Sequence, residues 1–401
     1  MLVSGIGIAG PTLAYWLALH GFKTTLVEIA PRLRTGGYVI DFWGRGFDVA
    51  EKMGMLPTIK CEAYDVKEIR LVDANGRRVG GFNAEVFRSA TNGRYVSIPR
   101  GELAKIIYKE VEGRCESIFG DSITKIEQDQ SGVRVAFERT GPRYFDMVIG
   151  ADGLHSVVRK LVFGKQDRFE KYFGYMVAAF AVNGYRPRDE DVYVSYSFPG
   201  KQVARFAMRN DRTMFLFVFA DDQGRHIEPQ DTNTHKDILR AEFGEAGWEC
   251  PQILAAMESC DEVYFDRVSQ VRMDTWSQGR VALIGDAAFC PSLLAGQGAA
   301  LAMISGYVLS GELSRTASQP QEAFQRYEQQ LRRFIAGKQK AAVQLASSFA
   351  PKTQLGIFFR NQVTKAFKLP LIVKLAMGPS LFDRIDLPDY PVSVGVVPRT
   401  Q

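Results

Sequence analysis

Hydrophobic and polar positions divide the chain into stretches of two different textures. Residues 1–164, and again the residues from 280 onward, combine short apolar runs with helical patterns, which is typical of layered α/β domains. From about residue 165 the pattern changes to alternating, aromatic-rich runs, as expected for antiparallel strands. The sequence therefore predicts an α/β fold in which an antiparallel sheet is inserted between two parts of a first domain.

The start of the chain predicts a βαβ unit. Met1–Ser4 is an apolar run, Pro11–His20 has a helical pattern, and Phe22–Glu28 is rich in residues that favour strands. The connection Gly5–Gly10 carries glycines at the GxGxxG spacing that binds dinucleotides, in the strand–turn–helix context that this motif requires.

Each glycine of this turn has a physical role in dinucleotide binding. Gly5 permits the tight turn, Gly7 lets the backbone approach a pyrophosphate, and Gly10 lets the helix pack close to the strand. Glu28 ends the second strand 18 residues after Gly10, where a carboxylate can accept hydrogen bonds from a ribose. The alternative is an ordinary glycine-rich turn followed by a surface glutamate.

Several further elements are predicted along the chain. They are a strand at Tyr38–Phe42, a helix at Arg45–Met53, a hairpin of Ile69–Val72 with Arg78–Phe82, a helix at Arg100–Val111, a second hairpin over 121–137, strands at Phe145–Ile149 and Arg280–Ile284, and a long helix over Pro320–Ser348.

Composition narrows the class of protein. The 401 residues are 46% hydrophobic and 24% charged, with a net charge of +5, which excludes a disordered chain and gives no argument for nucleic acid. Five cysteines without a CxxC pair and four scattered histidines indicate reduced thiols in a cytoplasmic protein and no metal site. The uncharged stretches Met1–Phe22 and Ala287–Gly311 contain spaced glycines, so we expect buried strand–turn–helix units rather than membrane segments.

Two later motifs follow predicted strands, at Gly150–Ser156 (GADGLHS) and at Gly285–Pro291 (GDAAFCP), the latter continued by Gly296–Gly298 (GQG). Together with the glycine fingerprint and with Arg100, they resemble the flavin-dependent aromatic monooxygenases of the p-hydroxybenzoate hydroxylase fold. The resemblance covers essentially the whole chain. It is strongest to short members without a thioredoxin-like tail, among them the tetracycline-inactivating hydroxylases.

The resemblance implies a Rossmann-like FAD-binding domain with an inserted antiparallel β-sheet substrate domain and C-terminal helices. The FAD-binding domain would comprise residues 1–164 and 271–335, the substrate domain 165–270, and the C-terminal helical region 336–401. The implied FAD contacts are Gly5, Gly7, Ala9, Gly10, Glu28, Arg34, Gly37, Arg100, Asp152, Gly285, Asp286, Pro291, Gly296, Gly298 and Ala299.

The motifs also imply particular roles. Asp286 would contact the ribityl chain, and the helix beginning near Gly298 would direct its positive end at the flavin pyrimidine, where reduced flavin carries negative charge. Asp152 belongs to a motif associated with FAD and with the nicotinamide cofactor. The alternatives are a helix cap for Asp286, a cap or turn for Asp152, and a solvated arginine for Arg100.

The sequence departs from the resemblance at two positions. Many relatives have histidine after GDAA and asparagine shortly after GQG, whereas this chain has Phe289 and Ala300. Backbone groups make most flavin contacts in such proteins, so we expect FAD to bind and hydrogen bonding beside the ring to differ.

A third predicted hairpin gives a candidate substrate wall. Gln202–Arg209 and Arg212–Phe219 flank Asn210-Asp211, and a two-residue loop would place Gln202, Phe206 and Met208 on one face with Phe215 and Phe217. Such a face suits a flat, partly polar ring system. The alternative is a core face beneath helices, and no residue here stands out as a catalytic base.

The C-terminal stretch Leu355–Phe382 mixes phenylalanines with arginine and lysines. It has the composition of an interfacial membrane helix, but we expect it to pack its apolar face on the protein and leave its lysines in water. In the short relatives a C-terminal helix covers the substrate entrance.

The expected activity is FAD-dependent hydroxylation of an aromatic or enolic small molecule, including polycyclic polyketides, with NADPH or NADH and O₂, through a flavin C4a-hydroperoxide. The enzyme is expected to be a monomer or homodimer. The alternatives are a flavin-dependent halogenase, whose WxWxIP signature is absent, an isoprenoid-lipid reductase of the same fold, and a flavin-bound protein without catalytic activity.

Overall fold

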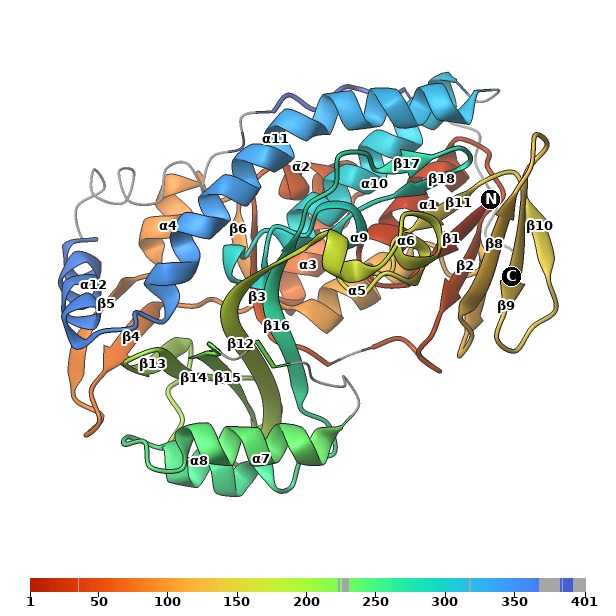
Figure 1. The fold of residues 1–401 in the computed structure, drawn as a ribbon. Coiled ribbons are helices and arrows are strands. Elements are labelled where there is room, and N and C mark those ends of the chain that lie inside the picture. The colour runs from red at the N-terminus through yellow and green to blue at the C-terminus, as the bar shows by residue number, and fades with distance from the viewer. Residues whose placement is uncertain are drawn as a thin grey trace.

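The computed structural model describes residues 1–34, 36–222, 224–225, 231–316, 319–367, 383 and 385–391, without the side chains of residues 294 and 344–349. Two sheets dominate the structure, and the long strands β12 and β16 run between the regions that they occupy (Figure 1). The predicted α/β class is confirmed.

The first sheet has six strands, of which the five in the run from β18 to β7 are parallel and the edge strand β17 is antiparallel to β18. These strands are short and mostly apolar, as in sheets that helices cover on both faces. Their order is β17 (Ser277–Gln278), β18 (Val281–Leu283), β11 (Val148–Gly150), β1 (Leu2–Ser4), β2 (Thr25–Glu28) and β7 (Glu116–Phe119).

Helices pack around this sheet and share its hydrophobic core. Helices α1 and α10 lie against each other, and the close approach depends on Gly306, where a Cβ would lie 2.9 Å from the Leu13 nitrogen. The helices are α1 (Ala9–Leu19), α2 (Arg45–Lys52), α3 (Leu56–Glu62), α5 (Arg100–Lys109), α6 (Val157–Val162), α9 (Asp286–Phe289), α10 (Gly298–Arg315) and the long α11 (Pro320–Phe349).

The second sheet has seven strands. It is antiparallel except at β13 and β4, which pair in parallel. Its order is β16 (Tyr264–Val271), β12 (Glu170–Asn183), β15 (Arg212–Ala220), β14 (Lys201–Ala207), β13 (Val192–Phe198), β4 (Glu68–Val72) and β5 (Arg78–Asn83). The β4–β5 hairpin was predicted correctly as a hairpin, and it joins this sheet although it precedes the other strands by about 90 residues.

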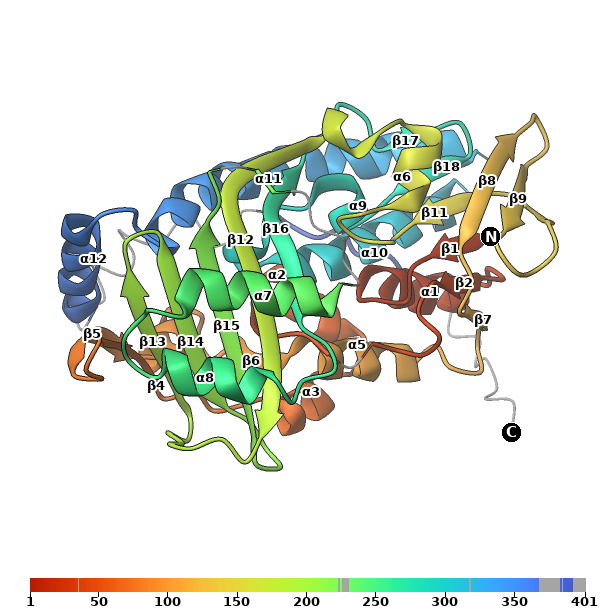
Figure 2. The same cartoon turned by 60° about the horizontal axis from the view of Figure 1, so that its bottom comes forward.

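Each face of the second sheet has its own covering. Helices α7 (Thr232–Phe243) and α8 (Cys250–Met257) lie across one face, as Figure 2 shows, and bury an aromatic cluster beneath them. The opposite face packs against the short antiparallel pair β3 (Val39–Trp43) and β6 (Tyr95–Pro99). This second face is the one that lies toward the first sheet and its helices.

The remaining elements are peripheral. The predicted hairpin over 121–137 is present as β8 (Ile123–Gln128) and β9 (Val133–Phe137), extended by β10 (Arg143–Phe145). Short helices are α4 (Glu85–Ala90), η1 (Gln166–Arg168) and η2 (Leu293–Ala295). Within the described ranges, no helix combines the length and the apolar character that a membrane crossing requires.

Helix α12 (Gln354–Ala366) packs on β5 at the edge of the second sheet. The expected inward apolar face is only partly correct: Ile357 and Phe367 are buried, but Phe358 and Phe359 are 55% and 64% exposed. Lys365 is exposed, as expected. Residues 368–382 of the predicted tail lie outside the described residues.

Candidate functional site

The carboxyl ends of four parallel strands bring the predicted motifs together. Strand β1 leads into Gly5, β2 ends at Glu28, β11 leads into Asp152, and β18 leads into Asp286. Because these strands are neighbours in one parallel sheet, their ends meet at one edge. Ligands of open α/β sheets bind at that edge, so the motifs form one candidate site.

Two glycines of the fingerprint are required by the fold. Gly5 has a φ of +106°, and a Cβ there would lie 2.4 Å from the Ala151 carbonyl oxygen. At Gly10 a Cβ would lie 2.0 Å from the Gly5 carbonyl oxygen. Gly7 differs, because its Cβ would meet only an Arg100 guanidinium nitrogen, at 3.9 Å. The space beside Gly7 therefore fits the close approach of a ligand rather than a need of the fold.

Glu28 lies in the interior of this edge and is 9% exposed, so the surface-glutamate alternative does not hold. Its Oε2 accepts the Ile6 N–H at 2.9 Å, and its Oε1 accepts the Ala30 N–H at 3.0 Å. The exposed Arg34 side chain donates to Oε1 at 3.3 Å. A carboxylate held at a fixed position beside the glycine turn is suited to accept further hydrogen bonds from a ribose.

Two helices direct uncapped N-termini at this region. The residues that precede α1 and α10 make no side-chain capping bond, and neither helix has an acidic residue in its first turn. The first N–H groups of a helix lack intrahelical acceptors and carry partial positive charge. Both termini are therefore suited to an anionic ligand, as expected for a diphosphate at α1 and a negatively charged ring at α10.

Asp286 lies beside the start of α10. Its two carboxylate oxygens are 3.6 and 3.8 Å from the position that a Cβ of Gly298 would take. Asp286 is the first residue of α9, Gly285 is the capping residue, and no capping bond from a side chain is present, so the cap alternative is not supported. Burial raises the pKa of Asp286, and the positive charge of Arg100 opposes that shift.

Arg100 begins α5 and donates its backbone N–H to the Tyr38 carbonyl at 3.0 Å. Its side chain lies between two glycine turns, near Gly7 and within 3.8 Å of the position of a Cβ at Gly37. This placement supports a ligand contact rather than a solvated arginine.

Two tyrosines that the sequence did not single out complete this part of the site. The rings of Tyr38 and Tyr264 are 5.8 Å apart, and both side chains are partly exposed. Burial raises the pKa of each hydroxyl, so both tyrosines stay protonated and can act as hydrogen-bond donors. Tyr38 follows the pair Gly36-Gly37 at the start of a predicted strand, which is a usable signal, whereas nothing in the sequence marked Tyr264.

Asp152 has its carboxylate occupied by the protein. Its Oδ1 accepts the Ser156 hydroxyl at 2.5 Å and its Oδ2 accepts the Val158 N–H at 3.0 Å, so it fixes the start of α6 as the cap alternative anticipated. Arg159, 1% exposed and missed by the sequence analysis, donates to the carbonyls of Leu154 and Ala287. It thereby ties the two predicted motifs to each other.

The loop between α9 and α10 contains buried polar atoms that fit a bound group. Pro291 and Ser292 are buried, and the Ser292 hydroxyl has no partner among the described residues, although its backbone adopts an unusual φ of +106°. The indole N–H of Trp43 is also buried without a described partner, and a Cβ at Gly296 would lie 3.3 Å from its ring. Buried donors without partners are rare in native proteins, so these two are suited to hydrogen-bond a ligand here.

The two departures from the resemblance have packing reasons. Ala300 lies where α2 comes close, since a Cβ at Gly46 would lie 2.4 Å from the Ala300 Cα, and a longer side chain would not fit there. Ala299 precedes it in the first turn of α10 and is partly exposed. Phe289 is 1% exposed and packs on Trp276 with ring centroids 4.6 Å apart. Both positions serve the core.

The predicted substrate wall is wrong in its register. Met208 pairs with Arg212, so the β14–β15 loop has three residues rather than two, and Phe206 lies opposite Met214 instead of Phe215. A shift of one residue moves a whole set of side chains to the other face. Phe215 and Phe217 therefore lie in the core beneath α7 and α8, as the alternative proposed.

The other members of that predicted wall remain on the face toward β3. Phe206 is fully buried between Tyr64 and Tyr193, with ring centroids 5.1 and 5.0 Å away, and Met208 is partly buried in the same cluster. Gln202 is 9% exposed, and its amide oxygen accepts the Ser197 hydroxyl at 3.2 Å.

Arg360 of α12 reaches the same amide. Its Nη1 donates to Gln202 Oε1 at 3.3 Å and to the Ser197 hydroxyl at 3.0 Å. The sequence analysis assigned the lysines of this helix to solvent and predicted no contact for Arg360, so it missed this link between the C-terminal helix and the sheet.

Comparison with known proteins agrees with this geometry. A family model described as FAD binding domain matches residues 1–340. A flavin-dependent monooxygenase from an unidentified prokaryote is 34% identical and covers 97% of this chain and 98% of its own length. The crystal structure of tetracycline destructase Tet(51) superposes with a TM-score of 0.81 at 32% identity, over 97% of this chain and 98% of that chain. Klebsiella pneumoniae HpxO, complexed with FAD and uric acid, shares the fold at 22% identity, with a TM-score of 0.77 over 95% of this chain and 96% of that one.

Proposed function

Because this chain belongs to the FAD binding domain family and several of its relatives are flavin-dependent monooxygenases, we propose that it hydroxylates an aromatic or enolic small molecule with NADPH or NADH and O₂. The balanced reaction takes one NAD(P)H, one proton, one O₂ and one substrate C–H bond, and yields NAD(P)⁺, water and a C–OH bond. The protein is proposed to be cytoplasmic and to act as a monomer or homodimer.

The observation that carries the proposal is the meeting of the glycine turn, Glu28 and Asp286 at one sheet edge, beside two uncapped helix N-termini. We assign the diphosphate to the N-terminus of α1, the adenosine ribose to Glu28, the ribityl chain to Asp286 and the ring to the N-terminus of α10. FAD, when bound, supplies the two-electron chemistry that activates O₂.

The chain's own residues then have defined tasks. Arg100, Tyr38 and Tyr264 present hydrogen-bond donors beside Asp286, and the buried hydroxyl of Ser292 would orient the ring. We expect the sheet face toward β3 to exclude water from the site, so that activated oxygen reacts with the substrate rather than with solvent.

A relative among the tetracycline destructases supports a substrate with fused phenolic or enolic rings. We further propose the division into an FAD-binding domain of residues 1–164 and 271–335, a substrate domain of 165–270 and a C-terminal region of 336–401. The β4–β5 hairpin is then a part of the first segment that contributes two strands to the substrate sheet.

The test is made on the purified protein. We expect a yellow protein that releases FAD on denaturation, and NADPH oxidation that phenolic or enolic polycyclic compounds stimulate. With ¹⁸O₂, the product should gain one labelled oxygen atom. A colourless protein that does not bind added FAD would refute the cofactor assignment, and flavin reduction without oxygen transfer to any compound would refute the monooxygenase activity.

A further inference from the structure

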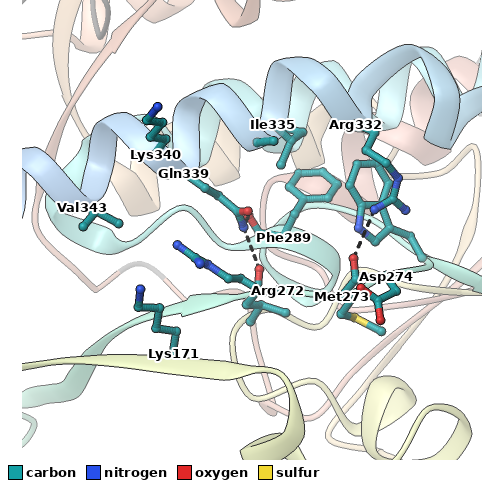
Figure 3. Close-up of a pocket in the computed structure, with 13 residues that line it drawn as sticks. Lys171, Arg272, Met273, Asp274, Phe289, Arg332, Ile335, Gln339, Lys340 and Val343 are labelled. Carbon is teal, nitrogen blue, oxygen red and sulfur yellow. Dashed lines mark hydrogen bonds between the residues drawn. The ribbon is translucent and has the colours of Figure 1, made fainter.

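A second concave site lies between the long helix α11 and the ends of β12 and β16, where Figure 3 shows its side chains. The cavity has a volume of about 600 Å³, which is in the range of small-molecule sites. None of the predicted FAD contacts lines it, so it is distinct from the site at the sheet edge. We call this cavity the α11 pocket.

The α11 pocket is strongly basic. Lys171, Arg272, Arg332 and Lys340 line it, and Asp274 is the one acidic residue among the described lining residues. Among the described residues, no carboxylate lies within 4.0 Å of the charged groups of Lys171, Arg272 or Lys340. Arg332 alone is neutralised, by Glu328 at 2.6 Å. Three positive charges that line one cavity and have no ion-pair partner among the described residues are suited to attract an anion.

Its other lining groups narrow the chemistry of that anion. Met273, Ala336 and Val343 supply accessible apolar surface, and Arg332 covers the ring of Trp276 at 4.7 Å. Asp274 offers an acceptor for hydroxyl groups. A nucleotide fits these groups better than a carboxylic acid or a polyanionic chain does. The cations suit its phosphates, the carboxylate suits its ribose hydroxyls, and the apolar surface suits its base.

The pocket is joined to the flavin-binding loop by hydrogen bonds of two glutamines, the partly buried Gln339 and the buried Gln270. Gln339 Nε2 donates to the Val271 carbonyl at 2.7 Å and to the Phe289 carbonyl at 3.2 Å. Gln270 Nε2 donates to the Pro291 carbonyl at 2.9 Å and to the Gln339 carbonyl at 2.7 Å. An occupant of the pocket thus lies against the same backbone segment that connects Asp286 to the loop before α10.

We propose that the α11 pocket binds the phosphate groups of a nucleotide. The inference rests on the proposed function in one respect: the reductant of that reaction, NADPH, carries such groups in its adenosine half. A free adenine nucleotide that acts as an effector is the other source of the same chemistry.

Equilibrium binding tests the site without turnover. The probe is 2′,5′-ADP, titrated calorimetrically into the FAD-loaded protein at low ionic strength. We expect saturable binding, and Lys171→Gln, Arg272→Gln and Lys340→Gln should each weaken it by roughly tenfold through loss of a charge-assisted contact. The matched control is Lys109→Gln, an exposed lysine of α5, which should bind as the wild type does. Absence of binding to the wild type, or binding to all three variants as tight as that to the wild type, overturns the proposal.

Steady-state kinetics then separates the two sources. If the reductant occupies the pocket, the three variants should raise KM for NADPH by a similar factor with little change in kcat, and NADP⁺ should compete with 2′,5′-ADP. If a free nucleotide occupies it, 2′,5′-ADP binding should fall in the variants while KM for NADPH stays constant. A protein that binds 2′,5′-ADP but oxidises neither NADPH nor NADH would refute the proposed function and support the pocket.

Discussion

The carboxylate of Glu28 accepts the backbone N–H of Ile6 at 2.9 Å, which fastens the end of β2 to the glycine turn that follows β1. The same side chain also accepts the Ala30 N–H at 3.0 Å. Glu28 therefore fixes the backbone of the site as well as offering an acceptor to a ribose. Its removal should therefore lower both the stability of the apoprotein and, as a separate effect, the affinity for FAD.

We expect Glu28→Ala to destabilise the apoprotein by roughly 1–3 kcal/mol, because the buried Ile6 N–H loses its acceptor. FAD binding should weaken by a further ~1.5–3 kcal/mol through the lost charge-assisted bond to the ribose. Chemical denaturation of apoprotein and fluorescence titration with FAD measure the two effects. Glu138→Ala, at an exposed position, is the control. Unchanged FAD affinity in Glu28→Ala would contradict the ribose assignment.

The glycine turn allows ligand binding to be separated from folding. At Gly7 a Cβ meets only a guanidinium nitrogen at 3.9 Å, so Gly7→Ala should leave the melting temperature of the apoprotein almost unchanged and weaken FAD binding strongly. At Gly10 a Cβ would overlap the Gly5 carbonyl oxygen, so Gly10→Ala should lower stability by roughly 1–3 kcal/mol or prevent folding. If Gly7→Ala retains FAD as the wild type does, the pyrophosphate does not pass this turn.

The elements that the sequence predicted well are those with local signals. The βαβ unit, the hairpins at Asn75-Gly76 and Asp129–Gly132, and the long helix α11 follow from periodicity and turn residues. The predicted buried strand before Asp286 is present as β18, so Asp286 lies at the carboxyl edge of the parallel sheet, as predicted.

The contacts that the sequence did not predict depend on geometry between distant segments. One extra residue in the β14–β15 loop moved Phe217 to the opposite face, and Asn210-Asp211 fits a loop of either length. Arg159 and Tyr264 reach the site from other elements, and no local pattern distinguishes them from ordinary core or strand residues.

The corrected register changes what Phe217 should do. It is fully buried, and its ring lies 4.8 Å from that of Phe243 in α7, so Phe217→Leu should lower stability by roughly 1–3 kcal/mol. The ranking of substrates should not change, because this face is covered by α7 and α8. Phe358→Leu, at a residue that is 55% exposed, should change stability by less than about 0.5 kcal/mol. A changed substrate preference in Phe217→Leu, without loss of stability, would refute the core assignment.

His155 should make stability depend on pH. Its hydrogen bond to Asp266, at 3.0 Å, raises the pKa of the imidazole above the ordinary value of 6.5. The folded protein therefore holds this proton more tightly than the unfolded chain, and the stabilisation is complete below pH 6.5 and disappears as the pH rises through the folded pKa. The melting-temperature difference between wild type and His155→Asn should be largest near pH ~6 and small by pH ~9. Since the pair is partly exposed, the effect should be modest, and Asp266→Asn should abolish its pH dependence. A difference that grows with pH would contradict this account.

Ser292 should have opposite effects with and without the flavin. Its hydroxyl is buried without a described partner, and the residue holds a φ of +106° in the loop before α10. An unsatisfied buried hydroxyl costs roughly 1–3 kcal/mol, so Ser292→Ala should stabilise the apoprotein. If that hydroxyl bonds the bound ring, the same substitution should weaken FAD binding by about 1 kcal/mol or more. Ser292→Gly removes the backbone strain as well as the hydroxyl. Once the ~0.5–1 kcal/mol entropic cost of glycine is allowed for, the apoprotein of Ser292→Gly should be at least as stable as that of Ser292→Ala. Chemical denaturation of both apoproteins measures their stability, and titration with FAD measures the affinity. Lower apoprotein stability with unchanged FAD affinity would contradict this account. It would mean that the hydroxyl bonds within the protein, with and without FAD, and makes no bond to the ring.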